Sequence, residues 1–380
     1  MRVVILGAGP AGLYLGYLLK RRSAGTDVRI FEQNPADATF GFGVVFSDRA
    51  LEFLKEDDPE TFAAITPHME SWEDITLIHR GERIAIDGIG FAALGRLRLL
   101  QLLQERARSV GLEPTYRQAV TSLDQFADAD LVVGADGVNS LVRRTHEREF
   151  GATIGHLSNH FAWFGTSKPF DTLTQTFCRT EFGHFNAHHY RYALDMSTFI
   201  IEVDKKTFEE AGLGQMAETA AKSLCERVFA EALDGHPLIS NNSIWRRFPI
   251  ARNERWSCGN RVLLGDALHT AHFSIGSGTR LALEDAIALD KALAGQPRDV
   301  PAALKAYESA RRPILQKLVG GADASAAWYD RFGDHMQLDP IDFAMSYVTR
   351  SGRIDLKRLR QLSPRFVARY ERERPATKSN

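Results

Sequence analysis

Short apolar runs that end in glycine alternate with helical stretches in the first part of the chain. Residues 2–6 (RVVIL) are such an apolar run before Gly7, residues 13–22 read as a helix, and residues 28–32 (VRIFE) read as a second strand. A buried parallel strand has apolar residues on both faces, whereas a surface helix has them on one stripe. The pattern predicts a β–α–β unit at the N-terminus.

The same alternation returns further along the chain. Residues 130–134 (DLVVG) and 261–264 (RVLL) predict two more buried strands, and residues 96–110, 279–293 and 302–318 predict helices. Strands that alternate with helices are typical of a parallel sheet covered by helices on its faces. The fold class predicted is α/β.

A different pattern separates these segments. Residues 155–205 are rich in aromatic and β-branched residues, which favour strands, and residues 74–86 read as a hairpin around Arg80-Gly81. Residues 215–233 are helical in pattern. We therefore predict a discontinuous α/β domain (1–70, 93–155 and 251–330), interrupted by a β-rich domain (71–92 and 156–250) and followed by a C-terminal helical tail (331–380).

Composition and charge exclude some functional classes. The chain has 380 residues with 47 Lys+Arg, 48 Asp+Glu and 44 % hydrophobic residues, so its net charge is -1. A disordered chain has low hydrophobicity and high net charge, and a nucleic-acid-binding protein needs a basic excess. We expect a globular protein that does not bind nucleic acid.

The C-terminal tail carries an excess of positive charge. Residues 351–380 hold nine basic residues, Lys378 among them, and three acidic ones, so the tail is +6 and the remainder -7. We expect a solvated helix that packs on an acidic body; an anion-binding or docking surface is the alternative.

Cysteines and apolar length bear on the compartment. Cys178, Cys225 and Cys258 are odd in number and far apart, which disfavours a disulfide framework or a structural zinc site. The apolar stretch 3–19 is interrupted by Gly7, Gly9 and Pro10, so it does not predict a membrane span. With no leader before the first strand, we expect a cytoplasmic protein that does not bind membranes.

The first motif with chemical meaning is GAGPAG, residues 7–12. Gly7, Gly9 and Gly12 have GxGxxG spacing between the first strand and the first helix, and Glu32 follows at the end of the next strand. Such a turn brings the bare amides of a helix N-terminus to a pyrophosphate, and the carboxylate accepts hydrogen bonds from a ribose hydroxyl. This arrangement predicts a dinucleotide site.

Two further motifs follow later strands. Gly134-Ala135-Asp136-Gly137 closes one buried strand, and Gly265-Asp266 closes another. Gly276-Ser277-Gly278 then opens a helix, and such an N-terminus can stabilise negative charge on a bound ring. By itself, a strand-end Asp-Gly pair is an ordinary turn.

These three motifs, in this order, resemble the flavoprotein aromatic hydroxylases of the para-hydroxybenzoate hydroxylase type over essentially the whole chain. The resemblance implies a Rossmann-like, glutathione-reductase-type FAD-binding domain interrupted by a substrate-binding β-sheet domain. It also implies an FAD contact for Arg96, which with Leu99 and Leu103 fits the family's helix motif. The cofactor-binding residues implied are Gly7, Gly9, Pro10, Ala11, Gly12, Glu32, Gln33, Gly43, Val44, Arg96, Asp136, Asp266, Gly276, Ser277 and Gly278.

A departure from the family pattern narrows the resemblance. Many members have prolines before the GxG loop, where this chain has His272-Phe273. The HFSIG run, with the segments 40–48, 163–166, 197–202 and 338–343, is similar to hydroxylases of salicyloyl-CoA, of anthraniloyl-CoA and of a violacein-pathway indole. The anthraniloyl-CoA enzymes continue into a reductase-like half, which we do not expect here because the sequence ends at Asn380.

The resemblance implies a monooxygenase. NADH or NADPH, which the sequence does not distinguish, reduces FAD; O2 then forms a flavin C4a-hydroperoxide that transfers oxygen to an electron-rich aromatic ring. Salicyloyl-CoA is the first substrate expected, and a free indole or N-heteroaromatic acid is the alternative. A non-oxygenating flavoprotein reductase and a protein that keeps FAD without turnover remain open, as does the choice between monomer and homodimer.

Candidate substrate-binding residues lie in the β-rich segment and beside the GxG loop. His188 and Tyr190 are two apart, so on a strand they share a face and could hydrogen-bond a ring substituent or assist its deprotonation. His272 is the third catalytic candidate, and Trp163 and Phe185 are expected as wall residues. A structural histidine and a core tyrosine are the alternative interpretation.

Metal ligation by His184, His188 and His189 is not expected, since no carboxylate lies in matching register. Candidate contacts to CoA phosphates are the basic tail and Arg246, Arg247, Arg252 and Arg255, unless these are ordinary solvated arginines.

Overall fold

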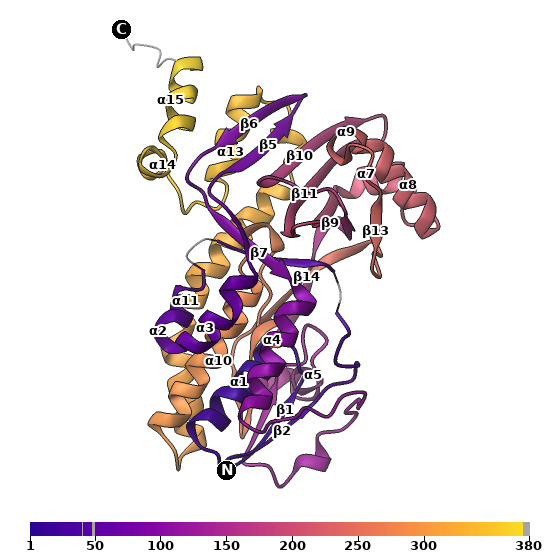
Figure 1. Cartoon of the computed structure of the whole chain (residues 1–380). Helices are drawn as coiled ribbons and strands as arrows, with labels where there is room; N and C mark the ends of the chain where they lie inside the picture. Colours follow the sequence, from indigo (N-terminus) through magenta and orange to yellow (C-terminus); the bar gives the residue numbers. More distant parts are fainter. Residues whose placement is uncertain (40, 48–49, 375–380) are drawn as a thin grey trace.

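The computed structural model describes residues 1–39, 41–47 and 50–374. Phe40 and Asp48, which bound one of the segments used for the resemblance, and Lys378 of the tail lie outside the described residues. The chain forms two lobes stacked end to end, with the N-terminus at the far end of one lobe and the C-terminal helices on the other (Figure 1).

The lobe that holds the N-terminus is built on a five-stranded sheet. Its strand order is β15-β16-β8-β1-β2, and all neighbours are parallel except the edge strand β15. All four residues of β8 are buried, as expected for a strand covered on both faces. The strands are β1 (Arg2–Leu6), β2 (Asp27–Phe31), β8 (Leu131–Gly134), β15 (Ser257–Cys258) and β16 (Arg261–Leu263).

Helices cover this sheet and pack on one another. α1 (Pro10–Arg22) buries every residue from Ala11 to Leu19, because it contacts the sheet, α4 (Arg96–Ser109) and α10 (Gly278–Gly295). These helices confirm the predicted α/β pattern. The shorter helices of this lobe are α2 (Glu52–Asp57), α3 (Pro59–Ile65), α5 (Leu141–Thr145) and α6 (Glu147–Phe150).

The second lobe is a large, mainly antiparallel sheet of order β13-β9-β12-β11-β10-β5-β6, with β14 also paired to β9. β10 pairs with β5 in parallel, which joins the hairpin 75–86 to the strands of the later segment. The strands are β5 (Ile75–His79), β6 (Glu82–Ile86), β9 (Ala152–Thr166), β10 (Leu173–Thr180), β11 (Gly183–Ala193), β12 (Met196–Val203), β13 (Leu238–Ser240) and β14 (Arg246–Asn253).

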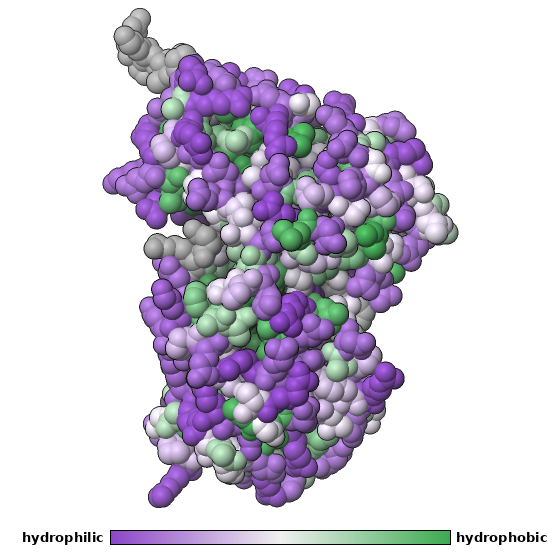
Figure 2. All heavy atoms as spheres, in the orientation of Figure 1, coloured by the Kyte–Doolittle hydropathy of each residue, from purple (hydrophilic) through white to green (hydrophobic). Residues whose placement is uncertain are grey.

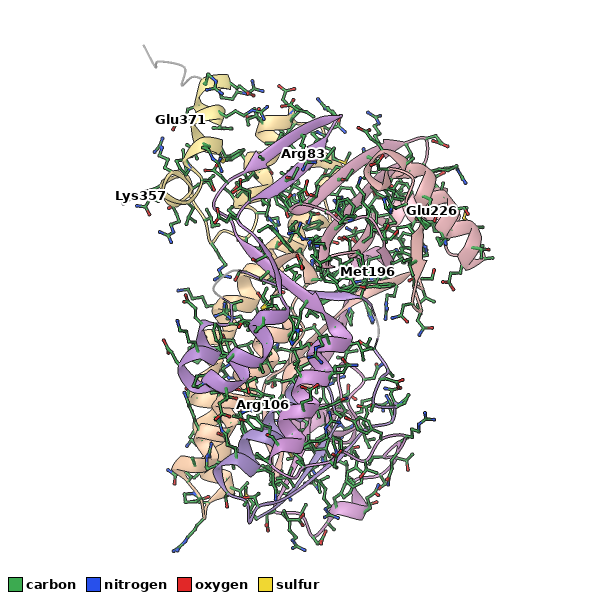
Figure 3. All side chains as sticks on the ribbon, viewed as in Figure 1. Arg83, Arg106, Met196, Glu226, Lys357 and Glu371 are labelled. Carbon is green, nitrogen blue, oxygen red and sulfur yellow. The ribbon has the colours of Figure 1, made fainter. Side chains whose placement is uncertain are left out.

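One face of this sheet is covered by short helices. These are α7 (Lys205–Glu210), α8 (Glu218–Val228) and α9 (Ala230–Leu233), and Phe229 and Leu224 pack there against sheet residues such as Phe185 and Phe199. The single helix predicted over 215–233 is therefore interrupted at Phe229. Figure 3 places Glu226 on these outer helices and Arg106 on α4 of the other lobe.

A three-stranded sheet of order β3-β7-β4 lies where the lobes meet (Figure 1). Its strands are β3 (Gly43–Ser47), β7 (Phe91–Gly95) and β4 (Glu70–Trp72). β7 leads directly into α4, and the Tyr190 hydroxyl of β11 donates to the Gly43 carbonyl at 3.1 Å. This sheet therefore ties the strands of the large sheet to the first lobe.

The longest helix, α11 (Val300–Tyr329), joins the two hydrophobic cores. Tyr307 belongs to the core of the first lobe, whereas Tyr329 packs in a core with the hairpin strands. The helix continues well beyond the predicted end at residue 318, through Gly320-Gly321. A Cβ on Gly321 would lie 2.7 Å from the Arg353 side chain, so this glycine permits close packing instead of ending the helix.

The C-terminal tail is helical, as predicted: α12 (Phe332–His335), α13 (Pro340–Thr349), α14 (Leu356–Leu362) and α15 (Pro364–Glu373). Arg365 pairs with Asp74 and Asp87, and Arg369 pairs with Glu82, so basic residues of the tail meet acidic residues of the hairpin. Figure 3 places Lys357 and Glu371 on α14 and α15 at this end of the molecule.

Hydrophilic residues dominate the face shown in Figure 2, and hydrophobic ones form scattered patches. Within the described ranges, no helix combines the length and the apolar character needed to cross a bilayer.

Candidate active site

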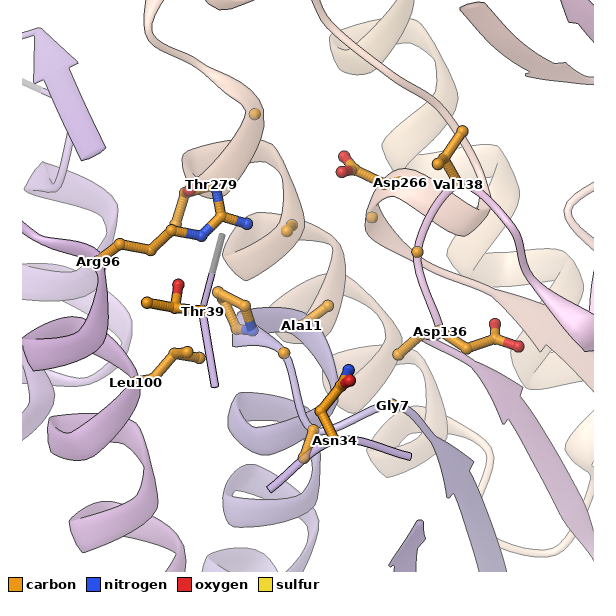
Figure 4. Close-up of a pocket in the computed structure, with 18 of the residues that line it drawn as sticks. Gly7, Ala11, Asn34, Thr39, Arg96, Leu100, Asp136, Val138, Asp266 and Thr279 are labelled. Carbon is orange, nitrogen blue, oxygen red and sulfur yellow. The ribbon is translucent and has the colours of Figure 1, made fainter. Parts of the chain in front are cut away.

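A cavity of about 840 Å³ runs from the carboxyl edge of the parallel sheet to the inner face of the large sheet. β1, β2, β8 and β16 all end at this edge, and ligands of open α/β sheets bind there. All predicted cofactor-binding residues line the cavity except Gly12, and so do His188 and Tyr190. Figure 4 shows Arg96, Ala11, Asn34 and Asp266 arranged around this space.

The first glycine motif forms a tight strand-to-helix turn. Gly7 has φ +99°, and a Cβ there would lie 2.3 Å from the Ala135 carbonyl oxygen. A Cβ on Gly12 would lie 2.0 Å from the Gly7 carbonyl oxygen, so Gly12 is needed for helix–loop packing although it does not face the cavity. Nothing lies within 4 Å of a Cβ on Gly9, which leaves room in front of the α1 N-terminus.

Glu32 lies at the end of β2, as predicted, and its carboxylate braces the motif. It accepts hydrogen bonds from the Ala8 amide at 3.0 Å and from the Asn34 amide and side chain at 2.8 Å each. Two carboxylate oxygens offer about four acceptor positions, so capacity for a further hydroxyl donor remains.

Asp136 and Asp266 are the other two acidic residues predicted to bind the cofactor, and both line the cavity. Asp136 accepts from the Leu141 amide at 2.6 Å, its second oxygen is buried without a partner among the described residues, and burial raises its pKa. Figure 4 shows that the Asp136 side chain extends to the side, away from Arg96, while Asp266 lies at the opposite wall from Arg96.

A buried ion network supports the Gly265-Asp266 turn. Asp285 accepts from the Gly265 amide at 3.2 Å, from His269 at 2.7 Å and from Arg311 at 2.8 Å, and Arg311 also pairs with Glu284. Burial of Asp285 opposes ionisation, but the charges and hydrogen bonds of His269 and Arg311 outweigh it and lower its pKa. The predicted GD motif is therefore held from behind by charged residues of α10 and α11.

Arg96 begins α4 and has its side chain in the cavity (Figure 4). Its guanidinium has no hydrogen-bond or ion-pair partner within the part of the chain that the structure describes. Burial lowers its pKa, and the negative charge of Asp266 opposes that effect. An unpaired guanidinium in a cavity wall suits an anionic or hydroxyl-rich ligand.

His188 and Tyr190 lie on one face of β11 at the inner end of the cavity, as predicted, with ring centroids 5.5 Å apart. Both ring nitrogens of His188 are buried and lack a partner among the described residues. Burial, followed by the charge of Arg350, lowers the pKa of His188 to about 3. Tyr190 is bonded to Gly43, and burial raises the pKa of its phenol.

Apolar side chains surround these two residues. Trp163, Ile200, Phe248 and Phe273 line the same part of the cavity. Trp163 is the wall residue predicted. Phe185 was wrong as a wall residue: it is three positions from His188, so it points to the opposite face of the sheet and packs in the core beneath α8 and α9.

His272 does not line the cavity, but it is buried behind it at the end of a hydrogen-bonded chain. Arg350 Nε donates to Ser325 Oγ at 2.9 Å, the two serine hydroxyls of Ser325 and Ser274 are 2.8 Å apart, and Ser274 Oγ is 2.9 Å from His272 Nδ1. Arginine can only donate, so the chain is satisfied when each hydroxyl donates onward. In this direction His272 Nδ1 accepts the hydrogen bond, and a neutral ring then carries its proton on Nε2.

Burial, with Arg350 and then His188 as further causes, lowers the pKa of His272 to about 3.

Ser274, Ser325 and Arg350 were not predicted as site residues, because no spacing connects them along the chain. Gln104, which follows the helix motif on α4, and Tyr116 also line the cavity, and neither was predicted from the sequence.

The site matches a known family. The family model described as "FAD binding domain" matches residues 1–125 and 100–322. The residues of the cavity also fit FAD independently of this match: the α1 N-terminus is open, Arg96 is unpaired among the described residues, and carboxylates lie at the ends of β2 and β16.

Three relatives cover nearly the whole chain. This chain is 42 % identical in sequence to a salicyloyl-CoA 5-hydroxylase of Streptomyces sp, over 92 % of this chain and 70 % of that protein. It is 34 % identical to the 3-hydroxy-4-methyl-anthranilyl-[aryl-carrier protein] 5-monooxygenase of Streptosporangium sibiricum, over 94 % and 97 %. It is also 34 % identical to the protodeoxyviolaceinate monooxygenase of Chromobacterium violaceum, over 92 % and 94 %.

Proposed function

The chain belongs to the FAD-binding-domain family as an FAD-dependent aromatic monooxygenase, and we propose that its substrate is an aromatic acyl thioester such as salicyloyl-CoA. The proposal includes NADH or NADPH as electron donor and a reducing, cytoplasmic compartment, in keeping with three free cysteines. The identity to a salicyloyl-CoA hydroxylase supports the thioester.

FAD, when bound, supplies the redox chemistry that activates O2. The chain's own residues would hold it: the α1 N-terminal amides would face its pyrophosphate, and Glu32 and Asp266 would accept hydrogen bonds from its hydroxyl groups. Arg96 contributes positive charge. Gly276, Ser277 and Gly278 also line the cavity, and their amides would stabilise negative charge on the flavin ring.

The observation that supports a hydroxyl- or amino-substituted aromatic ring is the unpartnered imidazole of His188 beside the aromatic residues Trp163, Phe248 and Phe273 of the cavity. A buried polar group without a partner is costly, so a ligand that satisfies it gains affinity and orientation. His188 accepts from, or donates to, the hydroxyl or amino substituent of the ring. Trp163, Phe248 and Phe273 exclude water from the reacting atoms.

His272 acts from behind this pocket. Burial, with Arg350 as a further cause, lowers the pKa of His272 to about 3 and so keeps its ring neutral, and Ser274 contacts Nδ1 of that ring. In this role it is a positioning residue, because it lies outside the cavity wall.

The test is a substrate panel with the FAD-loaded enzyme. Salicyloyl-CoA, free salicylate and an indole carboxylic acid are compared for NADH and NADPH oxidation, O2 uptake and product mass. We expect hydroxylated product in step with O2 uptake for the thioester. Turnover of only free salicylate or the indole would contradict the thioester assignment.

A further inference from the structure

A second cavity of about 700 Å³ lies in the substrate lobe. Phe164 of β9 lines it, whereas the neighbouring Trp163 lines the 840 Å³ cavity proposed to bind FAD, called the flavin cavity below. Adjacent residues of a strand point to opposite faces, so the two cavities lie on opposite faces of the large sheet at its β9–β14 edge. The proposed binding of FAD and of the aromatic ring involves only the first cavity, so the second cavity has no assigned role.

Arg246 lies between the two cavities, because it lines both. It pairs with Phe161 at the start of β14, and its guanidinium carbon lies 5.7 Å from the centre of the Phe161 ring. No ion pair joins Arg246 to a carboxylate within the described ranges, and its Nε is buried without an acceptor there. Arg246 is therefore a cation and a donor at the boundary between the cavities.

The wall of the second cavity is aromatic and apolar but contains unused polar atoms. Phe208 stacks on His160 with ring centroids 3.8 Å apart, and Met216 lies at the rim with 37 % of its surface exposed. Trp245 Nε1 and His160 Nδ1 are buried without partners among the described residues. Indole N–H groups and arginine can only donate, so the cavity suits a ligand with carbonyl acceptors on an apolar chain.

The charge of the cavity wall is also asymmetric. Arg246 and Arg247 are its two arginines, and Glu218 is its one acidic residue. Arg247 is exposed and lies opposite His160 in the strand pairing. A chain that ends in a phosphate therefore complements the cavity: carbonyl groups meet the inner donors, and the phosphate meets the exposed arginine.

We propose that this second cavity binds the phosphopantetheine arm of a thioester substrate whose aromatic ring occupies the flavin cavity, with Arg246 beside the thioester carbonyl. This inference rests on the proposed thioester function and adds the site that recognises the arm. The phosphopantetheine arm combines amide carbonyls, an apolar dimethyl segment and a phosphate. CoA and acyl-carrier proteins both carry it, so the chemistry is shared by these two sources.

The experiment compares salicyloyl thioesters of increasing length: S-methyl, pantetheine, CoA and the phosphopantetheine of a carrier protein. The wild-type holoenzyme should show a kcat/KM at least about tenfold higher for the pantetheine and CoA thioesters than for the S-methyl thioester, since two or more hydrogen bonds to the arm are gained. A higher kcat/KM for CoA than for the carrier assigns the free CoA thioester as source, and the reverse assigns the carrier.

Two variants probe the cavity. Trp245→Phe removes the indole donor while keeping a smaller aromatic ring, and Met216→Trp adds bulk at an exposed position of the cavity wall. Each should lower kcat/KM for the long thioesters by roughly threefold to tenfold and leave the S-methyl thioester within about twofold. Leu194→Trp, which adds a tryptophan at an 82 % exposed position outside both cavities, is the matched control and should change neither.

The outcomes separate the two proposals. Equal kcat/KM for all thioesters in the wild type, or an equal loss for short and long thioesters in both variants, overturns the cavity assignment while thioester hydroxylation stands. Hydroxylation of free salicylate with no thioester turned over overturns the proposed function, and the cavity assignment with it. The retained S-methyl activity reports that each variant is folded and loaded with FAD.

Discussion

Replacement of His188 tests whether this residue removes a proton from the substrate or orients it by a hydrogen bond. A ring hydroxyl has a pKa of about 10 in water, whereas burial lowers the pKa of His188 to about 3. Proton transfer between them is uphill by about seven pKa units, or about 9.5 kcal/mol. An ion pair at about 4 Å and an effective dielectric constant of about 20 returns only about 4 kcal/mol. His188 is therefore expected to act as a neutral hydrogen-bonding partner.

The magnitude follows from that role. His188→Ala should lose one neutral hydrogen bond, about 0.5–1.5 kcal/mol, and so lower kcat/KM by about twofold to thirteenfold. His188→Gln, which keeps a donor and an acceptor, should retain most of the activity. The uncoupled fraction of NAD(P)H oxidation, measured as hydrogen peroxide, should rise in the alanine variant because the ring is less well oriented.

The assay is hydroxylated product, O2 uptake and NAD(P)H oxidation between pH 5.5 and 9. Because His188 stays neutral over this range, its removal should leave the pH dependence of kcat/KM unchanged in shape. A loss of about 10²–10⁴-fold together with disappearance of an inflection near pH 6–7 would refute this reasoning and identify a general base. His68→Ala, at an exposed histidine outside the cavity, is the control.

Three further predictions concern the scaffold. Gly12→Ala places a Cβ 2.0 Å from a loop carbonyl oxygen and should weaken FAD binding severely, measured by flavin fluorescence on titration, whereas Gly295→Ala, with open space around its Cβ, should leave it unchanged. Asp285→Asn removes one of the two carboxylates that pair with Arg311, while Glu284 remains, and should destabilise the protein by about 1.5–3 kcal/mol in urea unfolding. The pKa of Asp285 is lowered in the fold, so its stabilising effect is present above the unfolded pKa of about 3.9 and is lost as the pH falls through the folded value. Wild type and variant should therefore converge in acid. Burial raises the pKa of Glu202 to about 8, so the wild type loses stability as the pH rises from about 4.3 towards that value. Relative to the wild type, Glu202→Gln should gain up to about 1.4 kcal/mol of stability per pH unit, read from melting temperatures at pH 5 and 8. A stability difference that stays constant with pH would show that Glu202 ionises normally.

Much of the cofactor site could be predicted from local pattern. The strand–turn–helix at residues 2–22 combines an apolar run, glycines at fixed spacing and a helix N-terminus, and each of these is a property of neighbouring residues. Parallel strands then bring Glu32 and Asp266 to one sheet edge without further information. The predicted pairing of His188 and Tyr190 followed in the same way from the two-residue period of a strand.

The sequence by itself determined which segments form strands and helices, where the dinucleotide turn lies and which strand carries the two polar pocket residues, because these depend on short-range periodicity and on backbone sterics. Only the tertiary structure decided which face of the large sheet lines the 840 Å³ cavity, and hence that Trp163 is a wall residue while Phe185 is core. It alone brought Arg350 to Ser325 and Ser274 and placed Arg246 between two cavities. Such contacts join residues far apart in the chain, and their partners are chosen by how whole elements pack, which no local pattern encodes.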